Sequence, residues 1–171
     1  MAETTKESKK KFSKGIITVQ ANDFIQKASY KNFDTVDIKI FKTILGKINH
    51  NDTLFKDFYT IDYDDLDEVN IDKKNRFAIV TKSLKKLAAY YVQLEQGTNT
   101  IEVGLIQNKF KYERNSSKIV VSVHEDLKPF LLDLSVKYTK YAIANLAELK
   151  NVYSIKLFEL LKSFQSLGYY E

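Results

Sequence analysis

Apolar residues recur with a helical period in the first half of the chain and alternate in the second half. A helix is predicted over 34–48, because five apolar residues fall on one face at about 100° per residue: Ile38, Phe41, Ile44, Leu45 and Ile48. Asp34 can cap this helix, and Asp37 stands where a capping box needs its second member. Val36 and Ile40 widen the apolar face. The helix is therefore expected to be covered on more than one side by the core, with a second subunit as the alternative cover.

Two further helices are predicted close together, over 63–69 and 73–89, with Asp62 and Asp72 as their N-caps. The packed face of the second helix is formed by Phe77, Val80, Leu84, Leu87 and Ala88. Its opposite face carries Asn75, Ala78, Ile79, Lys82, Lys85 and Lys86. A short helix, a tight turn and a longer helix with one packed and one basic face form the pattern of a helix-turn-helix.

Alternating apolar and polar residues after this helix predict an antiparallel sheet with strands near 91–95, 101–112 and 119–123. A sheet of this kind directly after a helix-turn-helix is the wing of a winged-helix domain. The predicted fold class is therefore α+β, a winged helix with extra N- and C-terminal helices.

The remaining elements lie at the two ends of the domain. A strand over 16–20 and a helix over 21–28 are expected first, and a helix over 125–134 follows the wing. The last helix, over 152–165, has Tyr153, Leu157, Phe158, Leu161 and Phe164 on its predicted core face. Residues 138–143 fit either a strand or a helix. Leu84 and Leu161 are both predicted to be core residues, so Asp at either position is expected to unfold the domain.

Basic residues cluster on the second helix and at the second hairpin turn, within a chain of net charge +5. Asn can bond an adenine edge, an apolar side chain can meet a thymine methyl, and lysines contact phosphates. The candidate DNA-binding residues are Lys73, Lys74, Asn75, Arg76, Ile79, Lys82, Lys85, Lys86, Lys109, Lys111, Arg114 and Lys118. The alternatives stay open: an ordinary solvated helix face, a partner that buries Ile79, and a basic hairpin tip without function.

Other classes of function have little support in the sequence. The absence of cysteine excludes disulfides and Cys-ligated zinc and fits a reducing cytoplasm. No apolar run approaches the roughly 18 residues of a membrane span. A metal-dependent enzyme needs converging carboxylates, and the one dense acidic cluster, over 62–68, reads better as helix capping. His50 and His124 lack ligand-like spacing, and the five glycines are scattered. We therefore expect no catalysis, no metal and no cofactor.

Three segments near the C-terminus carry a resemblance to a known family: Phe130–Leu134, Tyr138–Tyr141 (YTKY) and Tyr153–Leu161 (YSIKLFELL). Together with the early helices, they resemble the first winged-helix domain of the Rep replication initiators of iteron plasmids. The resemblance covers roughly residues 16–168. Two positions of the last helix differ mildly, since Lys156 replaces the usual Arg and Phe158 the usual Tyr.

The resemblance implies both an organisation and a function. Residues 1–15 are expected to be a disordered basic tail, 16–168 the first winged-helix domain, and 169–171 the junction to a second one that is missing here. Such initiators bind double-stranded plasmid origin DNA, start replication and recruit host replication proteins, including the helicase machinery. Their first domain contacts mainly phosphates and forms a homodimer. The alternative function is a winged-helix protein-interaction or repressor domain.

Overall fold

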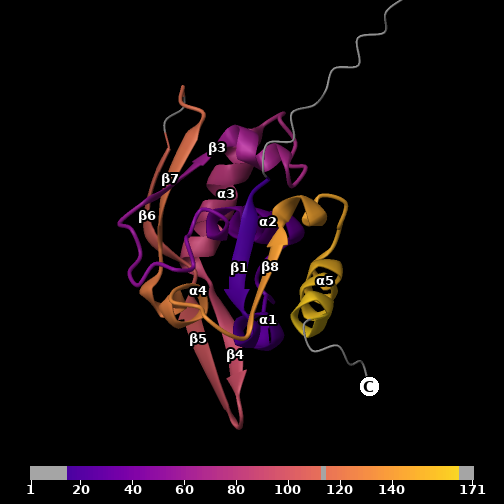
Figure 1. Ribbon diagram of the computed structural model, residues 1–171. Coiled ribbons are helices and arrows are strands. Elements are labelled where there is room, and N and C mark those ends of the chain that lie inside the picture. Colours follow the sequence, from indigo (N-terminus) through magenta and orange to yellow (C-terminus); the bar gives the residue numbers. More distant parts are fainter. Residues whose placement is uncertain (1–14, 113–114, 166–171) are drawn as a thin grey trace, which may run out of the picture.

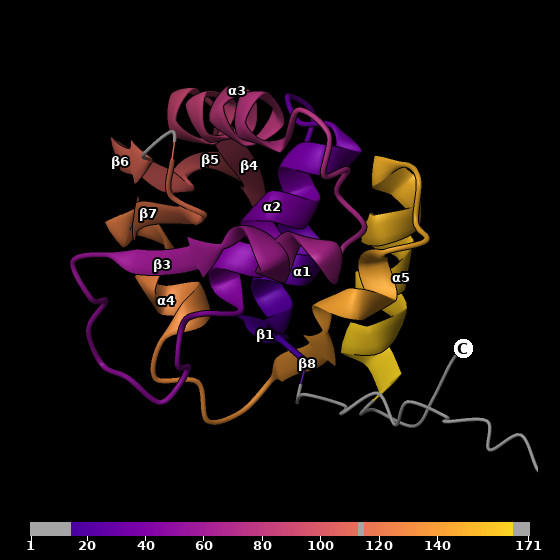
Figure 2. The same cartoon turned by 90° about the horizontal axis from the view of Figure 1, so that it is seen from above.

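Helix α2 (Thr35–Leu45) lies at the centre of the domain, and the other elements surround it (Figure 1, Figure 2). The computed structural model describes residues 15–112 and 115–165. Asp34 and Asp37 form the predicted capping box at the start of α2. Every residue from Asp37 to Leu45 is buried, so the prediction of a helix covered by the core on more than one side is confirmed. Residues 1–14 of the predicted tail over 1–15, and the predicted junction over 169–171, lie outside the described residues.

The N-terminal segment pairs with a strand from the far end of the chain. Strand β1 (Ile17–Ala21) runs antiparallel to β8 (Tyr138–Ala142), which settles residues 138–142 as a strand. Helix α1 (Asn22–Lys27) and the short strand β2 (Ala28–Ser29) follow β1.

The expected single sheet is wrong, because the described strands form separate sheets. Strands β4 (Tyr91–Gln96) and β5 (Asn99–Gly104) pair with β2. Strands β6 (Ile106–Tyr112) and β7 (Lys118–Val123) pair with β3 (Tyr59–Asp62). The two hairpins extend to opposite ends of the molecule (Figure 1).

The chain leaves one sheet and enters the next at Gly104 and Leu105. The backbone N–H of Gly104 donates to Asp126 at 3.0 Å. A Cβ at Gly104 would stand 2.5 Å from the His124 ring. Leu105 is fully buried. This close approach ends β5, so the predicted continuous strand over 101–112 is two strands.

The helix-turn-helix is shorter than its sequence pattern suggested. Its first helix is a 3-10 helix, η1 (Tyr63–Asp67), and its second is α3 (Arg76–Ala89). Asp72 does not cap α3, because its carboxylate accepts from the backbone N–H of Lys74 at 2.9 Å and closes a turn. Asn75 then takes the left-handed conformation, with φ 60°, which Asn tolerates better than most residues. The helix therefore begins three residues later than predicted.

The C-terminal third contains short helices followed by one long one. The predicted helix over 125–134 is a 3-10 turn, η2 (Glu125–Leu127), and one helical turn, α4 (Lys128–Leu131). A second 3-10 turn, η3 (Ile143–Leu146), leads to α5 (Val152–Gln165). Among the described residues, no helix is long and apolar enough to cross a membrane.

The predicted core face of α5 is wrong at three of its five positions, whereas Phe158 packs against the core as predicted. Tyr153, Leu157 and Leu161 are 87%, 60% and 50% exposed. The residues that α5 buries are Ile155, Glu159 and Ser163. The amphipathic pattern fails here because a charged residue, Glu159, lies on the inward face.

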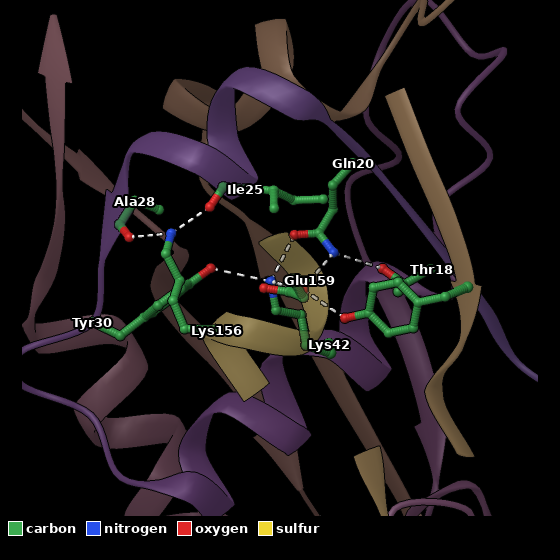
Figure 3. Close-up of polar contacts among 9 residues, drawn as sticks. Thr18, Gln20, Ile25, Ala28, Tyr30, Lys42, Lys156 and Glu159 are labelled. Atoms are coloured by element: carbon green, nitrogen blue, oxygen red, sulfur yellow. Dashed lines mark hydrogen bonds and ion pairs between the residues drawn. The ribbon is translucent and has the colours of Figure 1, made fainter. Parts of the chain in front are cut away.

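Glu159 is buried because a lysine of the central helix lies opposite it (Figure 3). Lys42 Nζ lies 2.8 Å from Glu159 Oε1, and both side chains are fully buried. Lys42 also donates to Gln20 at 2.6 Å and to the Tyr30 hydroxyl at 3.1 Å. The Tyr141 hydroxyl donates to Glu159 Oε1 at 2.6 Å. Five residues from α2, α5, β1, β8 and the loop after β2 thus share one buried polar network.

The network also controls the protonation of its members. Burial alone lowers the pKa of Lys42, but the Glu159 carboxylate and Tyr30 raise it overall, so the lysine stays charged. Burial raises the pKa of Tyr30 to about 12 and that of Tyr141 well above its ordinary value, with the nearby Glu159 adding to the increase. Both hydroxyls therefore remain protonated; that of Tyr141 donates to Glu159, and that of Tyr30 accepts from Lys42.

Removing one member of the ion pair should be more harmful than removing both. Lys42→Met leaves Glu159 as an unpaired buried charge, which typically costs about 3–5 kcal/mol. In Lys42→Met/Glu159→Leu no buried charge is left unpaired, so the double variant should lose less free energy of unfolding than Lys42→Met. Urea unfolding at pH 7 measures both values. A double variant less stable than Lys42→Met would show that the unpaired Glu159 carboxylate is not the source of the loss.

The two faces of α5 should respond in opposite ways to a negative charge. Ile155→Asp buries an unpaired carboxylate and should unfold the domain, because that cost exceeds typical marginal stability. Leu161→Asp faces solvent and should change the free energy of unfolding by no more than about 0.5 kcal/mol. Thermal melts followed by circular dichroism distinguish the two. A melt of Leu161→Asp far below that of the wild type would contradict the observed burial.

Candidate nucleic-acid interface

Arg76 fastens the start of α3 to the 3-10 helix before it. Its guanidinium donates to the Tyr63 carbonyl at 2.8 Å and to Asp67 Oδ1 at 2.8 Å. Further bonds reach the carbonyls of Asp72, at 3.3 Å, and Ile71. The residue is only 6% exposed. Arg76 thus fixes the geometry of the helix-turn-helix, and its side chain is not on the surface where the sequence placed it.

Two more residues of the predicted interface, Lys86 and Ile79, make contacts inside the domain instead of facing solvent. The Lys86 ammonium is bound to Asp37 and lies 3.3 Å from Asp34, at the capping box of α2. The hydrogen bond to Asp37 raises the pKa of Lys86 above its ordinary value. Ser83 donates to the same Asp37 at 2.6 Å. Ile79 is half-buried and packs against the core.

The remaining predicted residues of this region form an exposed basic surface. Lys73, Lys74, Asn75, Lys82 and Lys85 are all exposed. Lys73 lies 3.3 Å from Asp67. For Lys74, Lys82 and Lys85 there is no carboxylate within 4 Å in the part of the chain that the structure describes. Figure 2 shows α3 along the periphery of the domain, beside β6.

The sequence grouped the lysines of the second hairpin with those of α3, but two of them lie beside an aromatic ring just before another strand. Lys109 and Lys111 are exposed on β6, but their ammonium groups lie 5.6 and 5.4 Å from the centre of the Phe58 ring. Phe58 directly precedes β3, which is separated from β6 by β7. Lys118 is exposed at the start of β7. Arg114 lies outside the described residues.

Sequence analysis missed Phe58, since no local pattern distinguishes it. Its neighbours come from a strand about fifty positions further along the chain, and only the pairing of β3 with β7 and of β7 with β6 brings them together. The position of a single aromatic residue before a short strand gives no such signal.

The acidic cluster over 62–68 makes structural contacts, as predicted. Asp65 accepts from the backbone N–H of Asp62 at 2.8 Å and lies 2.8 Å from Lys47. Asp67 binds Arg76, and Glu68 accepts from the backbone N–H of Ile16 at 3.0 Å. Within the described residues, no group of three or more His, Asp or Glu side chains is placed to hold a metal ion.

Comparison with known proteins assigns the family. The family model described as "Initiator Replication protein, WH1" matches residues 17–162. This chain belongs to the initiator replication protein family. It is similar to "Probable replication protein rep" of Bifidobacterium longum (strain NCC 2705), with 22% identity over 152 residues. That match covers 88% of this chain and 51% of the relative, so the chain spans about half the relative's length.

A solved structure confirms the fold. The WH1 domain is similar to the crystal structure of Pi initiator protein in complex with iteron DNA, with a TM-score of 0.70 and 14% identity. The match covers 88% of this chain and 65% of that chain. The prediction of a winged helix, and the resemblance to replication initiators, are both confirmed.

The Arg76 contacts predict a specific loss of stability in the WH1 domain. Arg76→Ala should lower the free energy of unfolding by about 2–4 kcal/mol, since each buried carbonyl left without a donor costs about 1–3 kcal/mol. Arg76→Lys should recover only part of this, because lysine keeps the charge but lacks the planar fork. Urea unfolding at pH 7 is the measurement. Equal stability of wild type and Arg76→Ala would show that these bonds contribute nothing net.

The contact between Arg76 and Asp67 makes the free energy of unfolding depend on pH. The hydrogen bond from Arg76 lowers the pKa of Asp67 below its ordinary value of 3.8. A carboxyl with a lowered folded pKa stabilises the fold above its unfolded pKa and loses this contribution as the pH falls through the folded pKa. The stability difference between wild type and Arg76→Ala should therefore narrow below pH 3.8.

Proposed function

We propose that this WH1 domain is the DNA-binding domain of a plasmid replication initiator and contacts double-stranded origin DNA through the exposed lysines of α3. The observation that carries the proposal is the basic surface formed by Lys74, Lys82 and Lys85. Lys82 and Lys85 stand on the second helix of a helix-turn-helix, the element that enters or borders the DNA groove in such domains, and Lys74 stands in the turn just before it. The structural relative Pi initiator was crystallised with iteron DNA, which supports the same ligand class here.

Phosphates are the groups that this surface suits best. Lysines are flexible point charges that bind phosphate without fixing a direction, and phosphate contacts position a protein on the duplex without reading sequence. Asn75 is the exposed amide of the surface, a group able to bond an adenine edge. It stands at the residue before α3, and we propose that it contacts the backbone as well. Arg76, Ile79 and Lys86 are left out of the proposed interface, because their side chains serve the fold.

The whole initiator is proposed to form a homodimer and to engage host replication proteins, in line with the family resemblance. The structure offers one feature that favours a protein contact as the second candidate function. The outward face of α5 presents Tyr153, Leu157 and Leu161 at helical spacing to solvent. A surface of exposed large apolar side chains is typical of protein-interaction sites. A winged helix that binds only protein would use this face, and the lysines of α3 would contact no ligand.

Charge removal on α3 separates these two functions. Lys82→Ala/Lys85→Ala should fold normally and bind a 25-base-pair duplex more weakly, whatever its sequence. The plot of log affinity against log salt should flatten by about 0.9 for each lost phosphate contact, so by roughly two for the pair. Fluorescence anisotropy at several salt concentrations gives both values.

A matched control is provided by Lys31→Ala/Lys140→Ala, which removes two exposed lysines from other elements and should leave the slope unchanged. Identical slopes for wild type, the α3 variant and the control would show that α3 does not touch phosphates. The domain would then be better understood as a protein-interaction module.

A further inference from the structure

The sheet formed by β3, β7 and β6 has one face buried in the core and one face open to solvent. Ile61, Ile119 and Val121 are fully buried on the inner face. Alternate positions on these strands point outward, and Thr60, Lys109 and Lys111 among them are exposed. Helix α3 packs on the inner side of β6, where Phe77 meets Tyr112 with ring centres 5.1 Å apart. The outward side chains of β6 therefore belong to a surface distinct from that of α3.

Phe58 and two lysines form the centre of this outer face. The ammonium groups of Lys109 and Lys111 approach the half-buried Phe58 ring to 5.6 and 5.4 Å. Neither ammonium lies within 4 Å of a carboxylate among residues 15–112 and 115–165. The same surface is hollowed beside the ring. Phe58 and Lys109 line this depression together with Phe55, Asp57, Gln107 and Glu125.

We propose that this outer sheet face is a second nucleic-acid site, specific for single-stranded DNA, in which a base stacks on Phe58 while Lys109 and Lys111 bind the flanking phosphates. An aromatic ring beside cationic groups on an open sheet matches the two needs of a single strand, a stacking platform and a neutralised backbone. The inference does not depend on duplex binding by α3, because it rests on other residues.

Replacing the lysine contacts of the Phe58 ring by a stacked base favours the DNA-bound state. An exposed contact between a lysine and an aromatic ring strengthens an equilibrium by roughly two- to fivefold. Stacking of one base on an aromatic side chain strengthens it by roughly 5- to 150-fold. When a base displaces the ammonium groups from the ring, each lysine also gains a phosphate in place of a weaker partner. The contacts made by Phe58 in the free protein thus keep the lysines beside the ring without opposing the ligand.

A duplex is the less suitable occupant for a chemical reason. In double-stranded DNA the faces of the bases are covered by their stacked neighbours, so a duplex offers this surface only phosphates. Lysines alone would be enough for that role, and the aromatic ring would add nothing. The phenyl group beside the lysines is what distinguishes this face from α3, whose aromatic side chain, Phe77, packs against Tyr112.

Conservative substitutions of Phe58 test the stacking. Phe58→Leu keeps an apolar side chain of similar size and removes the ring, whereas Phe58→Tyr keeps the ring. Binding to a fluorescein-labelled dT15 strand, followed by anisotropy, should weaken at least fivefold in Phe58→Leu and stay within twofold of wild type in Phe58→Tyr. Affinity for the 25-base-pair duplex should be unchanged in both variants.

Two further variants separate this proposal from the proposed function. Lys109→Ala/Lys111→Ala, which changes only exposed side chains, should weaken dT15 binding and carries the test if Phe58→Leu fails to fold. Lys82→Ala/Lys85→Ala should weaken duplex binding but leave dT15 binding within twofold. Equal dT15 affinity of wild type and Phe58→Leu, or of wild type and Lys109→Ala/Lys111→Ala, would overturn the proposal. It would also be overturned if Phe58→Leu weakened duplex and dT15 binding to the same extent, since this face would then be part of the duplex site.

Discussion

The buried pair of Lys42 and Glu159 is the constraint on which the arrangement of the outer elements depends. A fully buried charge is tolerated only if it is paired and hydrogen-bonded, so α5 must present Glu159 to Lys42 and to the hydroxyl of Tyr141. That requirement fixes the rotation of α5 about its axis. Since Glu159 must face inward, Leu157 and Leu161, two positions away on either side, must face outward. The exposed apolar face of α5 is therefore a consequence of the buried charge.

Polar contacts also set the position of the helix-turn-helix. Arg76 holds η1 and the turn against the start of α3, while Lys86 and Ser83 hold α3 to the capping carboxylates of α2. The basic residues of α3 therefore belong to two groups with different tasks. Arg76 and Lys86 are bound by carboxylates and carbonyls, and the exposed lysines outside these contacts give the surface its charge. The number of basic residues on a helix thus overstates the charge available to a ligand.

Sequence patterns were sufficient for several features that local chemistry decides, although not for the turn that Asp72 closes before α3. The capping residues of α2 and the core position of Leu84 follow from neighbours within a few turns. The face of α5 could not be predicted, because the partner of Glu159 is a lysine in another helix, and a charged residue is otherwise assigned to solvent. The break at Gly104 depends likewise on His124, which comes from a later loop. Phe58 and the lysines of β6 meet only through the strand order of a sheet.

The two proposed nucleic-acid surfaces differ in the chemistry they offer, and that difference argues for two ligands in place of one extended interface. The α3 surface presents ammonium groups on a rigid helix, which suits the regular spacing of phosphates along a duplex. The outer sheet face adds an aromatic ring, which is useful only where a base is free to leave its stack. The two surfaces adjoin along β6, whose inward Tyr112 contacts α3 and whose outward lysines reach Phe58. A duplex on α3 and a separated strand on the sheet would therefore lie side by side, with β6 as the boundary between them.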